Sequence, residues 1–391
     1  MNTNNKIKLL IDFGLQPISN RYLTNPKDQE KLFPLKLGQC QKTGLIQLIE
    51  PVPFDELVPR YDWITYMEPE DHLDDLVERI KYYLPTNKSL KIGGVSFKDD
   101  PILKKFEKMS NKIWKIDLKH DLSLDNHLGI ESIQAAINKN VVDKIVKQNG
   151  KSDFLIARHI FEHVYNLGSF LESLNSLIYD DGYILFEIPD STTSLQSNDY
   201  TMTWEEHIIY LTPNTFKYLL RYHGFNIVFY HEYPSPHENL LVVLVSKNKA
   251  DHDKTLNRGL DNEISLGDKY SKYFNKIKNR IHNFLKIEKE HGKIALFGAG
   301  QDTIAFVNYL KNSEFFDCVI DDNKNKNGLF MPKSALPIVG SNVLSDNDHK
   351  LCLLSLNPIN EDKVVNKLRN EIGFNGKIYS IFPHSKYSFL K

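Results

Sequence analysis

Between residues 89 and 247 the chain alternates short apolar runs with amphipathic stretches, and this alternation restricts its fold more than any other feature. The apolar runs that fit strands are 90–92, 112–118, 153–157 and 183–188. Strands separated by helices of this length predict a parallel or mostly parallel sheet, with a final strand pair as an antiparallel edge. We therefore predict a central doubly wound, Rossmann-like α/β domain over residues 85–247.

The two flanking segments differ from this pattern. Residues 1–84 are rich in proline and carry only short β-like pieces before a helix predicted over 69–84, which indicates a small N-terminal domain. Residues 248–391 begin with a polar stretch to Gly267 and a helix predicted over 268–291, and then return to strand and helix alternation. We predict a C-terminal Rossmann-like α/β domain there, with a leading helix.

Composition excludes several classes of protein. The net charge is -1, which gives no electrostatic footprint for nucleic acid, and no apolar run approaches the length of a membrane span. The three cysteines, Cys40, Cys318 and Cys352, are far apart and form no C-x-x-C pair, so neither a disulfide framework nor a zinc knuckle is expected. We expect a cytoplasmic enzyme or binding protein with no nucleic-acid or membrane partner.

Doubly wound sheets bind ligands outside the carboxyl ends of their strands, which selects a few loops. Gly93 and Gly94 end the first strand of the central domain and would let the backbone approach a cofactor. Asp117, near the end of the next strand, is placed to bond ribose hydroxyls, with Glu131 as the rival acid. The alternative for the glycine pair is an ordinary turn.

The loop that follows the third strand contains Arg158, His159, Glu162 and His163. Two histidines and a glutamate at a strand end are typical of a metal site, but the sequence offers no third ligand nearby. We predict that Arg158 and His159 form a wall of the cofactor site and that no metal is bound.

Two further segments carry candidate chemistry. Glu206 and His207 lie beside Trp204, and a histidine next to carboxylates is a plausible general base, with an ordinary surface histidine as the alternative. His237 and Asn239 precede the last strand and are expected to face the same cleft, with a plain hairpin turn as the alternative.

An aromatic cluster formed by Tyr61, Trp63 and Tyr66 suits sugar binding, and packing between domains is an equally good interpretation. Near the C-terminus, 298–300 reads Gly-Ala-Gly between a strand and a helix, which on its own is weak evidence for a dinucleotide. We expect a helper domain that completes a nucleotide-sugar site.

The order of these segments resembles the S-adenosylmethionine-dependent sugar C-methyltransferases of deoxysugar biosynthesis, a three-domain family. The resemblance covers nearly the whole chain. It rests on these segments: 14–20, 40–48, 157–164, 177–189, 205–216, 223–225, 298–300, 321–328, 337–338 and 381–383.

The resemblance implies a mechanism. His207 would remove the proton next to a sugar ketone with support from Glu206, and the resulting carbanion would attack the methyl group of S-adenosylmethionine. A keto-sugar is needed because only an adjacent carbonyl makes that C–H acidic enough. His237 would belong to the substrate-binding loop, and Tyr66 would reach the sugar.

The chain departs from the family pattern in the N-terminal domain and at several predicted site residues. Thr43 stands where a zinc-binding partner of Cys40 is expected and the upstream cysteines are missing, so we predict no zinc. Trp204 replaces a tyrosine, and Glu238 with Asn239 replaces glycines. The first strand carries Lys91 where an acidic residue is usual, which weakens the expectation of cofactor binding.

We therefore predict a methyltransferase that acts on a nucleotide-linked keto-deoxysugar, with a place in deoxysugar and polysaccharide biosynthesis and with a monomeric or homodimeric state. Two alternatives remain. One is a methyltransferase-like protein that binds a sugar nucleotide without methylating it. The other is a related transferase or isomerase that uses the same histidine base without S-adenosylmethionine.

Overall fold

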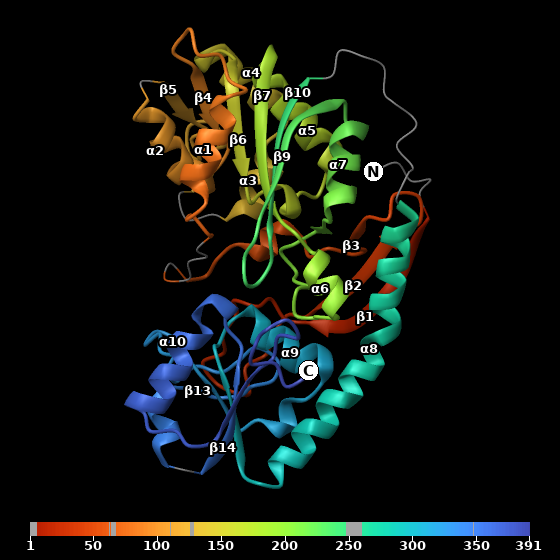
Figure 1. Cartoon of the computed structure of the whole chain (residues 1–391), viewed down its shortest axis with the longest axis vertical. Coiled ribbons are helices and arrows are strands. Elements are labelled where there is room, and N and C mark those ends of the chain that lie inside the picture. Colours follow the sequence, from red (N-terminus) through yellow and green to blue (C-terminus); the bar gives the residue numbers. More distant parts are fainter. Residues whose placement is uncertain are drawn as a thin grey trace.

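A computed structural model describes residues 6–61, 63, 68–109, 111–125, 129–247, 260–346 and 348–391. These residues form three β-sheets, with the central sheet in the upper half of Figure 1, the C-terminal sheet in the lower half and the first sheet between them. The first sheet has the order β1 (Ile7–Gln16), β2 (Phe33–Cys40), β3 (Ile46–Leu48), β8 (Ile209–Tyr210). The central sheet has the order β5 (Lys112–Lys115), β4 (Lys91–Gly94), β6 (Ser152–Arg158), β7 (Ile178–Pro189), β10 (Leu240–Lys247), β9 (Phe225–Tyr233). The third has the order β13 (Ile338–Val339), β12 (Cys318–Ile320), β11 (Lys293–Phe297), β14 (His349–Leu354), β15 (Lys377–Ser380).

The central sheet confirms the doubly wound prediction. Strands β5, β4, β6 and β7 pair in parallel, and β10 runs antiparallel to both β7 and β9. The helices of this part of the chain are α1 (Leu73–Lys81), α2 (Asp100–Glu107), α3 (Ile130–Ala136), α4 (Lys139–Asn149), α5 (Leu167–Ser176), α6 (Thr192–Ser197) and α7 (Pro213–Tyr222). The ligand-binding edge of such a sheet lies at the carboxyl ends of β4 and β6.

Successive residues of the central strands point to opposite faces of the sheet, and both faces are covered. On β6, Phe154 and Ile156 pack in a cluster with residues of α1 and α2, while Leu155 and Ala157 pack in another with residues of α4 and α5. Strands buried on both faces read as continuous apolar runs, as observed in the sequence.

Two predicted helices have different boundaries in the structure. The amphipathic stretch 133–148 predicts a single helix, but the structure has two helices there, because Ile137 is extended and Asn138 begins α4 by accepting hydrogen bonds from the amides of Asn140 and Val141. The helix expected from Pro69 begins at Leu73.

The leading helix of the C-terminal part, α8 (Leu260–Lys289), also starts earlier than the predicted residue 268. Gly267, read as the end of a linker, lies inside α8 and contacts the first sheet. A Cβ atom at this position would lie 2.4 Å from Oε1 of Gln39, whose Nε2 donates to the carbonyl oxygens of Gly44 and Glu263. Glycine is therefore used here for close approach of a helix to a strand rather than for breaking the helix.

The C-terminal sheet is parallel throughout its five strands, and α9 (Gln301–Leu310) follows β11 through the Gly-Ala-Gly turn. This part also contains α10 (Glu361–Asn366). The boundaries at 84 and 247 stay predictions, and β8, from the predicted central segment, pairs with β3 of the first sheet.

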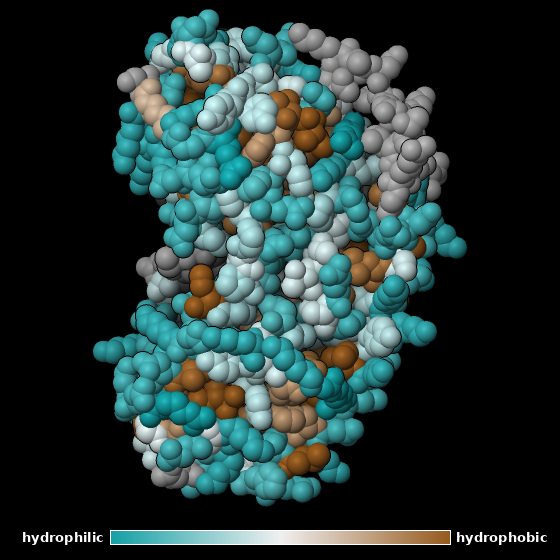
Figure 2. Space-filling model, in the orientation of Figure 1, coloured by the Kyte–Doolittle hydropathy of each residue, from teal (hydrophilic) through white to brown (hydrophobic). Residues whose placement is uncertain are grey.

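The surface is mostly hydrophilic on the face seen in Figure 2, where hydrophobic residues form small separate groups. Within the part of the chain that the structure describes, none of the helices has the length and apolar character needed to cross a membrane.

Candidate functional site

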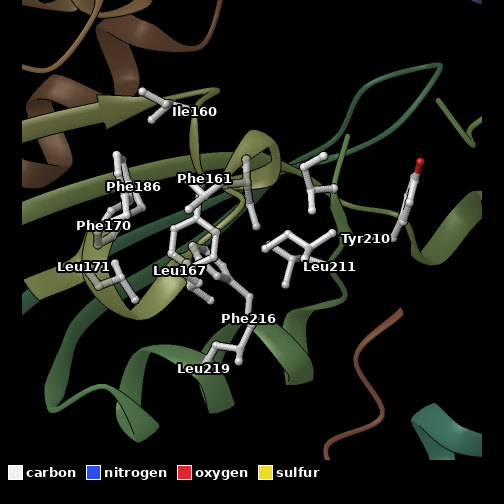
Figure 3. Packing of buried hydrophobic residues seen from close by; sticks show 14 of the residues in the cluster. Ile160, Phe161, Leu167, Phe170, Leu171, Phe186, Tyr210, Leu211, Phe216 and Leu219 are labelled. Carbon is white, nitrogen blue, oxygen red and sulfur yellow. The ribbon is translucent and has the colours of Figure 1, made fainter. Parts of the chain in front are cut away.

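A short 3₁₀ turn after β6, η3 (Phe161–His163), brings polar side chains to the carboxyl edge of the sheet. Phe161 anchors this turn in the core, where it meets Phe186 and Phe216 edge to face at centroid distances of 5.5 and 5.2 Å (Figure 3). The anchored ring leaves Glu162 and His163, the next two residues, inside a buried polar cluster. The apolar core thus fixes the position of the polar residues.

A buried carboxylate on β7, Glu187, organises the first half of this cluster. Its oxygens accept from Nη2 of Arg158 at 2.7 Å and lie 3.0 Å from Nε2 of both His159 and His72. Burial alone would raise the pKa of Glu187, but Arg158 and the two histidines hold it well below its usual range. The predicted wall residues Arg158 and His159 are thus brought together, and Glu187 is the partner that the sequence analysis missed.

His159 adopts a left-handed backbone conformation, with φ of 46°, which is uncommon for a residue other than glycine. Its Nδ1 lies 3.5 Å from Glu68 and 3.7 Å from Glu162. Burial alone would lower the pKa of His159, but Glu68, Glu162 and Glu187 raise it to about 10. His159 is therefore a buried cation at physiological pH, in a backbone conformation that its charged partners help to maintain.

His163 and Glu131 form a second buried pair, with Nδ1 of His163 2.8 Å from Oε1 of Glu131. Burial alone would lower the pKa of His163, but Glu131 and Glu162 hold it above its ordinary value. Glu131, the rival candidate for a ribose contact, thus lies against a histidine, and its contact with ribose stays a prediction. Glu131 lies in the first turn of α3, which begins at Ile130.

His207 lies against this pair, and its ring meets that of His163 at 90° with the centroids 4.8 Å apart. Trp204 covers it from another side at a centroid distance of 5.0 Å. Burial lowers the pKa of His207 to about 4, and the positive charge of His163 adds to the shift, so the imidazole is neutral at physiological pH. A neutral, half-buried imidazole in this position is able to accept a proton.

Glu206, the predicted support of His207, is buried, and burial with the charges of Glu131 and Glu205 raises its pKa well above the usual range. The carboxylates that act on the pKa of His207 are Glu162, Glu68 and Glu131. The supporting role of Glu206 stays a prediction. Glu205 accepts from the backbone amide and hydroxyl of Ser19, which ties this segment to the N-terminal part.

The turn after β4 differs in detail from the prediction. Gly93 and Gly94 lie within β4, where a Cβ atom would meet the indole of Trp114 and the side chain of Leu103 at 2.7 and 2.6 Å. Their glycine identity is therefore explained by packing, and a contact with cofactor stays a prediction. Asp117 lies just beyond β5 and is exposed, with Oδ1 accepting from the amide of His120.

The amides of that turn already have an acceptor. Asp99 is fully buried and its carboxylate accepts from the backbone amides of Val95, Ser96 and Arg158 at 2.7 to 2.8 Å. Burial raises the pKa of Asp99 to about 7 despite these bonds. Asp99 thus links the end of β4 to the end of β6 at the edge where ligands bind in this fold.

The predicted substrate residues fall into two further places. Tyr61 packs on Trp63 with centroids 4.8 Å apart, and both contact the C-terminal core, which supports the domain-packing interpretation. Tyr66 lies outside the described residues. His237 contacts Phe382 and His384 of the C-terminal part at centroid distances of 4.9 and 5.7 Å.

Asn239 stabilises the turn that carries His237, because its Oδ1 accepts from the amide of Ser235 and its carbonyl oxygen accepts from the amide of Asp190. It also lines a polar groove of about 770 Å³ between α6, α7 and α8. The structure thus groups Arg158, His159, Trp204 and His207 around η3, while His237 faces the C-terminal part.

Some residues of the site were recognisable only in part from the sequence. The strand-end rule that selected Asp117 applies equally to Glu187, which closely precedes Pro189 at the end of β7. Glu68, which follows the aromatic cluster in the sequence, pairs with Lys98 and faces His159. No local pattern links these groups, since they come from separate segments.

Three family models match the chain in the order of the three predicted parts. Residues 3–57 match the family described as "Putative zinc binding domain", 102–229 the methyltransferase domain, and 244–383 the C-methyltransferase C-terminal domain. The C-methyltransferase NovU of Streptomyces niveus is 22% identical over 249 residues, which is 62% of this chain and 59% of NovU. Together with the doubly wound central sheet, these matches define the class as α/β proteins of the methyltransferase type.

Over these segments the chain is therefore similar to methyltransferases and, in its C-terminal part, to C-methyltransferases. Among solved structures, a 1,6-didemethyltoxoflavin-N1-methyltransferase of Burkholderia thailandensis is 12% identical with a TM-score of 0.29, covering 52% of this chain and 96% of its own. Magnesium protoporphyrin IX methyltransferase of Synechocystis PCC 6803 is 12% identical with a TM-score of 0.32, covering 45% of this chain and 82% of its own. The similarity to C-methyltransferases therefore rests on the sequence matches and not on these structures.

The match to a zinc-binding domain raises the question of whether the N-terminal residues fit zinc. Cys40 is the one cysteine in residues 3–57, and it is buried at the end of β2, where its backbone pairs with Leu45. Over the described residues, the group of three potential ligands that lie close together is elsewhere, at Glu162, His163 and His207. The N-terminal residues therefore do not fit a zinc site, and the absence of zinc stays a prediction.

Proposed function

We propose that this protein is an S-adenosylmethionine-dependent C-methyltransferase that acts on a nucleotide-linked keto-deoxysugar. The matches to methyltransferase and C-methyltransferase domain models support the reaction class, and the arrangement of η3 and His207 at the carboxyl edge of the central sheet supports the chemistry. The chain spans 59% of the curated relative that it matches, so activity and substrate are proposals about this protein.

The observation that carries the proposal is the position of His207. Its ring is half-buried and touches His163 and Trp204. In the reaction, an imidazole nitrogen of His207 takes the proton from the carbon next to the sugar ketone. The electron pair of that C–H bond passes into the enolate, whose carbon is the nucleophile. The carboxylates of Glu162 and Glu68, which act on His207, stabilise the imidazolium that results.

S-adenosylmethionine would supply an electrophilic methyl group on a positively charged sulfur. The residues present fit this ligand in two respects. Asp117 is exposed at the end of β5, with one oxygen free of the His120 amide to accept ribose hydroxyls. Burial, and then the charge of Glu68, raise the pKa of Glu238 to about 8. A cation bound nearby would stabilise the charged form of this carboxyl group.

The test separates proton removal from methyl transfer. Wild-type protein freed of metal with a chelator is incubated in D₂O with a panel of nucleotide-linked keto-deoxysugars and without cofactor, and loss of the proton next to the ketone is followed by NMR. Addition of S-adenosylmethionine to the sugar that exchanges then gives a product whose mass is greater by one methylene. Absence of exchange and of product with every sugar of the panel contradicts the proposal.

A second candidate function is supported by the turn after β4. Asp99 already occupies the amides of Val95 and Ser96, and the cations Lys98 and Arg158 lie beside them. These features favour the alternative function, in which the protein binds a sugar nucleotide without methylating it. The same NMR experiment distinguishes the alternatives, because exchange without methylation indicates a histidine base that acts in another reaction, and binding without exchange indicates a binding protein.

A further inference from the structure

We infer that Glu162, His163 and His207 together bind one divalent transition-metal ion, of the kind that imidazole and carboxylate ligands favour. One donor atom from each residue can be chosen so that all three lie within 4.8 Å of one another. The sequence around η3 supplies no third ligand, so no metal is predicted there from the sequence alone. The fold supplies that ligand from a distant segment.

Backbone pairing brings the distant histidine into place. The amide of Ile208 donates to the carbonyl oxygen of Glu162 at 2.8 Å, so the residue before it, His207, is held directly beside η3. Phe161 fixes the other side of this pairing in the apolar core. The three donors are therefore carried by two segments that are joined by a main-chain hydrogen bond, which is a rigid arrangement for a metal site.

Glu162 gives independent evidence for a ligand. It is 3% exposed, and its Oε2 has no hydrogen-bond partner among the residues that the structure describes. A buried carboxylate oxygen without a partner is unfavourable, and a metal cation that binds it removes this penalty. The other oxygen, Oε1, lies 3.7 Å from Nδ1 of His159 and 3.9 Å from Nε2 of His163.

The surroundings of His163 resemble those of metal-binding histidines in proteins. Its Nδ1 lies 2.8 Å from Oε1 of Glu131, and its Nε2 lies 3.9 Å from Oε1 of Glu162. A carboxylate behind the distal nitrogen of a ligating imidazole fixes the orientation of the ring and strengthens it as a ligand. Glu131 is thus a positioning residue for the ion rather than a ligand.

The donor set defines the class of metal. Two imidazoles and one carboxylate suit Zn²⁺, Co²⁺ or Ni²⁺ rather than Mg²⁺ or Ca²⁺, which prefer oxygen ligands. Bonds of about 2.0–2.2 Å require the three side chains to draw closer by rotation. His207 is half-buried, so one coordination position remains open on its side for water or another ligand.

Metal binding and proton abstraction by His207 exclude each other, because both use the lone pair of the imidazole. The ion would therefore inhibit the base of the proposed reaction. This consequence depends on the proposed function, whereas the site itself rests only on the ligands and their geometry.

Direct binding of metal is the test. Protein freed of metal with a chelator is titrated with Co²⁺, and the visible ligand-field band of the bound ion is recorded, followed by displacement with Zn²⁺. We expect one ion per chain in the wild type. Glu162→Gln and His207→Asn should each weaken binding by more than the roughly tenfold expected for the positioning variant Glu131→Gln. His120→Asn, which changes an exposed histidine, should bind like the wild type.

The variants are checked for folding by circular dichroism, and His207→Asn, at a half-buried position, is the variant expected to tolerate substitution best. Failure of the wild type to bind Co²⁺ overturns the inference. So does an affinity that is the same in the wild type, Glu162→Gln and His207→Asn. Neither result bears on the proposed function, because proton exchange by metal-free protein is measured separately.

Discussion

The rings of His163 and His207 meet at 90° with their centroids 4.8 Å apart, although the two residues lie on different segments of the chain. Burial alone would lower the pKa of His163, but Glu131 and Glu162 hold it above its ordinary value, whereas burial, and then the charge of His163, lower the pKa of His207 to about 4. The two imidazoles therefore differ in basicity, and His207 is the one that is neutral and available to accept a proton.

His207→Ala is expected to abolish proton exchange while preserving the fold. Loss of a positioned general base lowers the rate by about 10²- to 10⁴-fold. The measurement is the rate of deuterium incorporation next to the ketone of the sugar that the wild type exchanges. The control variant His120→Ala alters an exposed histidine and should exchange at the wild-type rate. Exchange in His207→Ala at the wild-type rate would remove His207 from the mechanism.

Glu187→Gln is expected to destabilise the protein strongly, because it leaves Arg158 and His159 buried without their anionic partner. Removing one partner of a buried ion pair costs about 3–5 kcal/mol. The free energy of unfolding is measured by urea denaturation. Glu172→Gln, which changes an exposed carboxylate on α5, should have little effect. Equal stability of the two variants would show that the cluster around Glu187 does not hold the edge of the sheet together.

Gly267→Ala tests the contact between α8 and the first sheet. Alanine normally favours a helix interior over glycine by about 1 kcal/mol. Here the added Cβ atom would lie 2.4 Å from Gln39, which is buried and hydrogen-bonded to two carbonyl oxygens. We expect a net loss of about 1–3 kcal/mol in the free energy of unfolding. Ser265→Ala on the exposed face of α8 should stabilise slightly, and a similar gain in Gly267→Ala would contradict the packing.

Asp302 makes stability depend on pH. Burial, and then the charge of Asp199, raise the pKa of Asp302 from 3.8 to about 8. A carboxyl group whose pKa is raised by folding contributes stability below its unfolded pKa and loses it as the pH rises through the folded value. Between pH 4 and 8 the wild type should therefore lose stability relative to Asp302→Asn. Denaturation of both proteins across this range measures the difference, and a constant difference would show that Asp302 titrates normally.

The central fold was predictable from sequence because strand periodicity is local, and the four apolar runs that were read as strands coincide with β4, β5, β6 and β7. The two errors in helix boundaries have different causes. Gly267 reads as a breaker unless its contact with Gln39 is known, and the break between α3 and α4 depends on the cap formed by Asn138.

The candidate site was predictable residue by residue but not as an assembly. His207 and the pair Glu162 and His163 were each recognised as chemically unusual, yet the backbone pairing that joins them is visible only in the fold. The partners Glu187 and Glu68 come from other segments again, so spacing along the chain could not connect them with His159.

Binding of the cofactor is the measurement that tests the central claim most directly. Wild-type protein, shown to be folded, is titrated with S-adenosylmethionine and S-adenosylhomocysteine in a calorimeter. The account predicts a Kd of about 10 μM or tighter. Asp117→Ala should bind more weakly, and Asp143→Ala, which changes an exposed residue of α4, should bind like the wild type. Absence of binding of both ligands to the folded wild-type protein would contradict the assignment as an S-adenosylmethionine-dependent enzyme.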